Sequence, residues 1–162
     1  MINFTEHIHN WAKSEVIQGK IMIVVGVLFL VALLCILKSQ HQLLRGALIP
    51  FSIIVAILIG YGSYVIYSRT MHVKERLALF QKSQHEAIVK EKNKHAKEYK
   101  MGKIFMKTYP VIVVITMVAL LFLNSPYNQG WCIGIAILSI IAFIVDYGFV
   151  SRSSTFLSFL NT

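Results

Sequence analysis

Histidines beside acids are the first residues of this sequence that could do chemistry, because they could hold a metal ion. Glu6, His7 and His9 lie close together, but the rings of an H-x-H pair point to different faces of a helix, and no further ligand has a recognised spacing. The histidines of the basic segment are expected to be exposed: His72, His85 and His95. We therefore expect no metal site, no cofactor and no catalytic centre with a known motif.

Two cysteines and one acid are the other reactive side chains. Cys35 and Cys132 fall near corresponding ends of two apolar blocks, so they could form a disulfide in an oxidising compartment if the blocks are neighbours; two core thiols are the alternative. Asp146 is the only acid inside an apolar block, and such acids usually turn toward a partner. We predict a structural ion pair with Arg69, whose planar guanidinium suits a carboxylate, or with Lys107. An ion- or proton-binding role and snorkelling to water are the alternatives.

Four long apolar blocks must position these residues. Of the 162 residues 56% are hydrophobic, and the mean hydropathy is +0.65, well above an ordinary soluble domain. Unbroken blocks of this length are typical of membrane-spanning helices. They predict spans at about residues 21–37, 47–67, 108–123 and 131–150. A cleaved signal peptide is the alternative for the first block, but no A-x-A-like site follows it, so we expect a retained span.

The predicted fold is an all-α integral membrane protein, with four transmembrane helices in two hairpins joined by a basic cytoplasmic helical segment. That segment is rich in helix formers and is expected to reverse between Ser83 and Asn93 and to meet the third span near Gly102; two helices lying flat on the membrane are the alternative. The predicted parts are an interfacial amphipathic helix capped by Asn3 (1–19), a transmembrane hairpin (20–68), a Lys-rich helical hairpin (69–107), a second transmembrane hairpin (108–150) and a cytoplasmic tail (151–162).

The uneven distribution of charge predicts the orientation. Segment 69–107 holds eleven basic and four acidic residues, whereas loop 124–130 holds no charge. Because Lys and Arg near short loops resist translocation, segment 69–107 and both termini are placed in the cytoplasm. Fourteen basic residues then lie inside and two outside. We expect a multi-pass protein of a bacterial inner membrane.

The lysine-rich part of this segment is a candidate surface for anionic lipid headgroups or for a partner. Basic residues near a membrane surface each attract anionic lipid by about 1 kcal/mol. Nucleic acid fits less well, because the segment is richer in Lys than in Arg, and Arg is the residue suited to bidentate phosphate contacts. The candidate residues are Lys90, Lys92, Lys94, Lys97, Lys100 and Lys103.

Small residues repeat in two of the spans and predict close helix packing. In the second span Ser52, Ala56 and Gly60 lie on one helical face, and the fourth span begins with Gly130 and Gly134. Packing within one chain is one interpretation. Contact with further copies of the chain or with another membrane protein is the other.

The layout is similar to that of bacterial inner-membrane immunity proteins against pore-forming toxins, and to small accessory subunits of secretion or conjugation machines. This resemblance implies a non-catalytic protein that acts through protein–protein contacts in a larger membrane assembly. A homo-oligomeric channel or small transporter is the first alternative, although a pathway normally needs polar residues inside the membrane and only a few lie in these spans. A membrane enzyme without a recognisable motif is the second.

Overall fold

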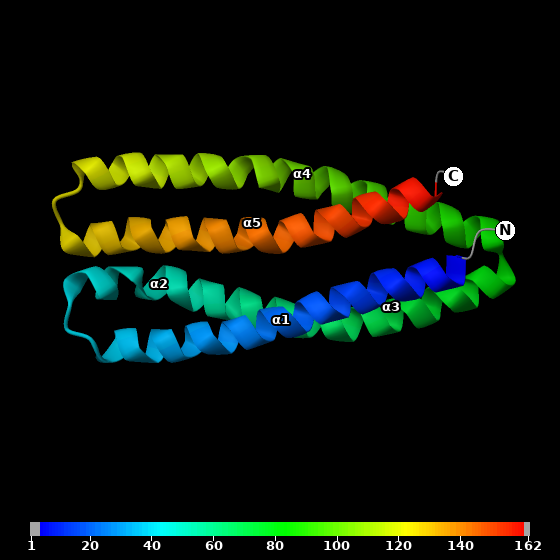
Figure 1. Ribbon diagram of the computed structural model, residues 1–162, viewed down its shortest axis with the longest axis horizontal. Coiled ribbons are helices and arrows are strands. Elements are labelled where there is room, and N and C mark those ends of the chain that lie inside the picture. Colours follow the sequence, from blue (N-terminus) through cyan, green and yellow to red (C-terminus); the bar gives the residue numbers. More distant parts are fainter. Residues whose placement is uncertain (1–3, 161–162) are drawn as a thin grey trace.

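The computed structural model describes residues 4–160, and this part of the chain forms four long helical rods without a strand (Figure 1). The second rod joins α2, a π-helical turn η1 and α3 end to end. The bounds are α1 Phe4–Lys38, α2 Gln42–Ala56, η1 Ile57–Tyr61, α3 Gly62–Lys82, α4 Gln84–Phe122 and α5 Pro126–Leu160. Residues 1–3, which include the predicted cap Asn3, and residues 161–162 lie outside the described part.

Each rod is long and apolar enough to cross a membrane, which confirms the prediction of an all-helical chain with four such helices. The helix starts at Phe4, the break at Ser83 and the helix end at Leu160 lie together at one end of the bundle, which we call the charged end (Figure 1). The links 39–41 and 123–125 lie at the opposite end, which we call the loop end.

The break between α3 and α4 has a local cause. Ser83 has an extended backbone conformation (φ −153°, ψ 101°), and its hydroxyl accepts a hydrogen bond from the backbone N–H of Glu86 at 3.4 Å. Ser is a preferred N-cap residue because its oxygen satisfies one of the free N–H groups of the new helix. The predicted reversal thus takes a single residue, and α4 runs on without interruption through Gly102.

The rods pack in a fixed order. Figure 1 shows α1 beside α2 and α3, and α5 beside α4, with α2 and α5 as neighbours in the middle of the bundle. At the loop end α2 lies between α1 and α5. Cys35 on α1 and Cys132 on α5 are both free thiols. The possible disulfide is not formed, because α2 separates the two helices that carry the cysteines. Cys35 is exposed and Cys132 is partly buried, so Cys35 is not a core thiol either.

A hydrophobic cluster closes the charged end. Phe4, Ile8 and Trp11 of α1 are buried against Val73 of α3 and Phe156 of α5. Phe4, Ile8 and Trp11 form the apolar face of the helix predicted to lie on the membrane surface, and this face is buried inside the bundle instead. Residues 4–19 continue directly into the first apolar block.

The last part of α5 belongs to the same cluster. Phe156 and Leu160 are buried in this cluster, and α5 runs through both without a break. The described part of segment 151–162 is therefore the last part of a helix of the bundle.

Glycines allow the closest crossings between rods. A Cβ added to Gly130 of α5 would lie 1.8 Å from the carbonyl oxygen of Leu43, and one added to Gly46 of α2 would lie 1.9 Å from the carbonyl oxygen of Tyr127. Gly134 is similarly packed against Pro50. The predicted small residues of the fourth span therefore serve packing within the chain, where they let the backbones of α2 and α5 touch.

Candidate functional site

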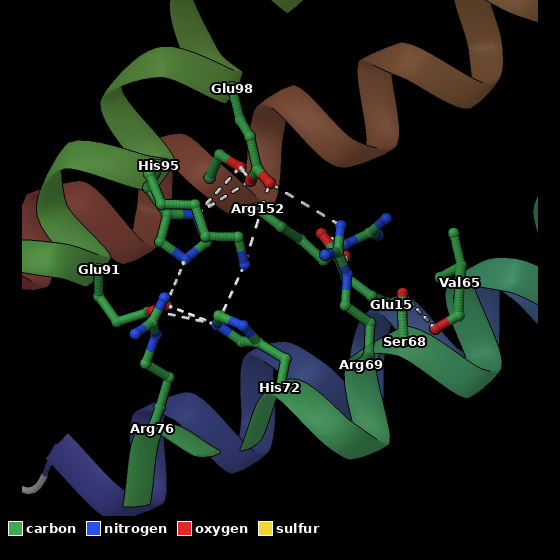
Figure 2. A network of polar contacts seen from close by, with 12 residues as sticks. Glu15, Val65, Ser68, Arg69, His72, Arg76, Glu91, His95, Glu98 and Arg152 are labelled. Atoms are coloured by element: carbon green, nitrogen blue, oxygen red, sulfur yellow. Dashed lines mark hydrogen bonds and ion pairs between the residues drawn. The ribbon is translucent and has the colours of Figure 1, made fainter. Parts of the chain in front are cut away.

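A network of buried and partly buried polar and charged side chains lies at the charged end and draws on all four rods (Figure 2). One half of the network centres on Glu15 of α1, whose side chain is only 1% exposed. Nε of Arg69 donates to Oε2 of Glu15 at 2.5 Å, and Nη2 of Arg69 lies 4.0 Å from a carboxylate oxygen of Glu98. Nε of Arg152 lies 3.9 Å from Oε1 of Glu15. These contacts tie α1, α3, α4 and α5 together.

The other half centres on Glu91 of α4, which is fully buried. Nε of Arg76 donates to Oε1 of Glu91 at 2.5 Å, and Nε2 of His72 lies 3.0 Å from the same carboxylate. Nε2 of His95, one helical turn further along α4, lies 3.4 Å away. One carboxylate of α4 therefore holds two side chains of α3 and one of its own helix.

His95 connects the two halves. Its Nδ1 lies 3.3 Å from Oγ of Ser153 on α5, and that hydroxyl donates to Glu98 at 3.4 Å. Lys94 is the residue before His95 on α4, and its Nζ lies 3.1 Å from Nε2 of His72 and 4.5 Å from the centre of the Trp11 ring. The network is thus continuous from α3 through α4 to α5.

Two histidine predictions are wrong and one agrees with the structure. The side chains of His72 and His95 are 13% and 0% exposed, because both contact the buried carboxylate of Glu91 inside the bundle. His85 is exposed, as predicted. The sequence does not single out Glu15 or Glu91. The available signal for Glu91 was its spacing from His95, since residues four apart share a helix face.

The two central acids have pKa values shifted in opposite directions. Burial acts to raise the pKa of Glu91, but the hydrogen bonds from His72 and His95 and the charge of Lys94 outweigh it, and the pKa lies well below its ordinary value of 4.5. Burial raises the pKa of Glu15 above 4.5, despite the opposing charge of Arg69. The arrangement therefore favours the ionised form of Glu91 and disfavours the ionised form of Glu15.

The lowered pKa of Glu91 predicts an acid-sensitive contribution to stability. A carboxylate whose pKa falls on folding contributes stability that is full above its unfolded value of 4.5 and is lost as the pH falls below it. We expect Glu91→Gln to lower the free energy of unfolding by about 2 kcal/mol near neutral pH, and we expect this difference to shrink as the pH falls from about 5 to about 3.

Unfolding of the unmodified protein and of Glu91→Gln, in mild detergent at a series of pH values, measures this difference. Glu15 contributes a pH dependence of opposite sign, but it is present in both proteins and drops out of the difference. Glu75→Gln is the control, because Glu75 is exposed. A Glu91→Gln penalty that stays constant over the acid range contradicts the assignment.

Asp146 does not form the predicted ion pair. Its Oδ2 accepts a hydrogen bond of 2.7 Å from the hydroxyl of Tyr109 on α4, whereas Arg69 is held by Glu15 and Lys107 is exposed. Asp146 and Arg69 nevertheless line one cavity of about 180 Å³ among the rods. The prediction is wrong because the guanidinium of Arg69 is bound by Glu15, which lies on a distant part of the sequence.

The lysine surface is present, with one exception. Lys94 turns inward toward Trp11 and is only 22% exposed. The other five candidates are exposed: Lys90, Lys92, Lys97, Lys100 and Lys103. Among residues 4–160 no group of three or more His, Cys, Asp or Glu has the arrangement of a metal site.

The small residues of the second span lie on the outside of the bundle. Ser52, Ala56 and Gly60 are all exposed, and a Cβ added to Gly60 would meet nothing within 4 Å. Gly60 also belongs to the π-helical turn η1, a feature often found at functional positions. This exposed strip is therefore unused in packing within the chain, unlike Gly130 and Gly134.

Comparisons with protein-family models, curated proteins and solved structures find no match for this chain.

Proposed function

We propose that the chain is a non-catalytic, multi-pass membrane protein that acts through protein–protein contacts within the bilayer, as a subunit or accessory partner of a larger assembly. The observation that carries this proposal is the exposed strip Ser52, Ala56 and Gly60. Without a hydrophobic driving force in lipid, helices associate where small residues let backbones approach. The strip offers such an approach to a helix from outside the bundle.

Polar residues inside the predicted spans weigh against a transport pathway through one chain. The hydroxyls of Ser52, Ser63 and Thr116 donate to backbone carbonyls of their own helices. Asp146 is held by Tyr109 at 2.7 Å. Because hydroxyls that bond their own helix satisfy themselves locally, they do not form a chain of polar groups from one end of the bundle to the other.

We place the charged end in the cytoplasm and the loop end outside, with the two transmembrane hairpins joined by the basic helical segment 69–107. The basis is the excess of Lys and Arg in that segment over loop 124–130. The exposed lysines of α4 then face the cytoplasmic leaflet or a cytoplasmic partner. A bacterial inner membrane is the expected location.

Cysteine labelling tests this orientation. In a variant without Cys35 and Cys132, a cysteine introduced at Ser125 is expected to react with a membrane-impermeant reagent in intact cells, because link 123–125 faces outward. One introduced at Ser83 is expected to react only after the cells are opened. Labelling of the Ser83 variant alone in intact cells would reverse the proposed orientation.

The contact surface is tested with Gly60→Leu. We expect this variant to keep the melting temperature of the isolated chain, because the position opens to the outside, and to lose association with its partner or with other copies. Native mass spectrometry of protein purified in mild detergent reports both the partner and the stoichiometry. Stoichiometric foreign subunits identify a heteromeric assembly, and a ring of one chain identifies a homo-oligomer.

Gly62→Leu is the matched control, two residues away on the inner side. A Cβ there would lie 2.9 Å from the carbonyl oxygen of Gly19, so the control is expected to lower the melting temperature of the chain itself. If Gly60→Leu leaves every association intact, the strip is not the contact surface.

A further inference from the structure

Two cavities lie one above the other along the seam between α1 and α5. The first, of about 430 Å³, is at the charged end; we call it the polar cavity. Its α1 side carries His7, Asn10, Trp11 and Ser14, which follow one another along one helical face. Its α5 side carries Arg152 together with hydroxyl and aromatic residues: Thr155, Phe156, Ser158 and Phe159.

The second cavity, of about 350 Å³, lies deeper along the same two faces; we call it the apolar cavity. On α1 the face continues through Gln18, Ile21 and Val25, and on α5 it runs back through Gly148 and Ile144. Ile21 and Ile144 are 58% and 64% exposed, so this cavity opens sideways. The two cavities follow the same faces of α1 and α5, and we call them together the α1–α5 groove. Gln18, which follows Ser14 along α1, reaches across to α5 and donates to the backbone carbonyl of Val145 at 2.8 Å.

The junction between the two cavities lies near the predicted membrane boundary. Most residues of the apolar cavity belong to the spans that begin at Ile21 and end at Val150, whereas Leu58 belongs to the second span and Gln18 lies three residues before Ile21. Arg152 lies two residues beyond Val150, about 3 Å along the helix axis. A guanidinium at that depth is level with the phosphates of the bilayer, whose polar region begins at the edge of a hydrocarbon core about 30 Å thick.

Arg152 is the cation of the polar cavity, and its charge is incompletely compensated. Its nearest carboxylate, Glu15, lies 3.9 Å away and is already bound by Arg69 at 2.5 Å. Nε and Nη2 of Arg152 are buried and have no hydrogen-bond partner. Burial lowers the pKa of Arg152 in spite of Glu15. No carboxylate is among the residues that line the polar cavity, so its charge suits an anion.

We propose that the α1–α5 groove binds one anionic phospholipid, with its phosphate at Arg152, its headgroup in the polar cavity and an acyl chain in the apolar cavity. Hydroxyl and amide groups beyond Arg152, from Ser14, Asn10 and Thr155, suit a polyol headgroup such as that of phosphatidylglycerol. Arginine is the residue of choice for phosphate, because its planar donors match phosphate oxygens. This proposal rests on the membrane insertion proposed above and is independent of the exposed strip.

Native mass spectrometry of the full chain in mild detergent tests the proposal, with phosphatidylglycerol or phosphatidylcholine added at equal concentration. We expect phosphatidylglycerol to be retained more tightly by on the order of tenfold, a difference of about 1.4 kcal/mol. Arg152→Gln is expected to remove that preference and Arg152→Lys to retain part of it. Arg45→Gln, an exposed arginine at the loop end, is the control and is expected to keep it.

A second variant tests the acyl chain separately. Ile144→Trp fills the apolar cavity without touching Arg152, and it is expected to weaken retention of both lipids. Equal retention of the two lipids by the unmodified chain, or an unchanged preference in Arg152→Gln, would overturn the proposal. Displacement of phosphatidylglycerol by excess inorganic phosphate, with retention unaffected by Ile144→Trp, would assign the polar cavity to free phosphate and also overturn it.

Discussion

Replacement of Glu15 by Ala is expected to lower the free energy of unfolding by about 3 to 5 kcal/mol, the range for removing one member of a buried ion pair. Glu15 is 1% exposed and its partner Arg69 is 14% exposed, so the variant leaves a largely buried guanidinium without its closest carboxylate, with Glu98 4.0 Å away. Arg152 loses its nearest acid as well. Reversible unfolding in detergent measures the loss, and Glu75→Ala, at an exposed position, is expected to change stability by about 0.5 kcal/mol or less.

A double-mutant cycle with Glu15→Gln and Arg69→Gln separates the pair from its surroundings. Because the two side chains share a 2.5 Å hydrogen bond, their effects are expected to be strongly non-additive, with a coupling of about 1 to 3 kcal/mol. Strictly additive losses would show that the contact contributes nothing beyond the burial of each group. The same cycle with Asp146→Asn in place of Glu15→Gln is expected to give a much smaller coupling.

A single added methyl group at Gly130 is expected to be the most disruptive small change in the apolar part of the bundle. The new Cβ would lie 1.8 Å from a backbone carbonyl oxygen of Leu43, and a backbone atom cannot rotate away as a side chain can. Gly130→Ala is therefore expected to force α2 and α5 apart and to cost about 3 kcal/mol, the upper part of the usual range for overpacking. Gly130→Leu is expected to prevent the native crossing.

Gly60→Ala is the matched control for this substitution. Its Cβ would meet nothing within 4 Å, and replacing Gly by Ala inside a helix normally stabilises by about 0.5 to 1 kcal/mol. Thermal unfolding of the two variants in the same detergent makes the comparison. A Gly130→Ala variant as stable as Gly60→Ala would mean that α2 and α5 do not cross at this point.

Local patterns predict the helices of this chain well, because each depends on neighbouring residues alone. Unbroken apolar blocks indicate four helices able to span a membrane, and the structure confirms them. The sequence predicts the reversal between Ser83 and Asn93, and the structure has it at Ser83. A Ser followed three residues later by Glu is the local signal that could have placed it there.

The partners of buried groups could not be predicted, because they depend on which helices become neighbours. Arg69 and Asp146 are near in space, but Glu15 competes for the guanidinium from a helix whose position the sequence does not give. The amphipathic stripe at Phe4, Ile8 and Trp11 has the same ambiguity. An apolar stripe of this kind suits a membrane surface or the inside of a bundle equally well.

Outward-facing apolar surface is distributed unequally among the rods. Only 6% of the most apolar window of α4 is buried, compared with 28% for the rod containing α2 and for α5, and Leu121 and Phe122 are 81% and 78% exposed. Along such a stretch a side chain needs only to be apolar, so exchanges among Leu, Ile, Val and Phe are expected to change stability little. Descendants of this gene would diverge fastest there, while Glu15, Glu91 and Gly130 would be held nearly fixed. Distant relatives would then share a few scattered polar and glycine residues, which add little to the overall sequence identity.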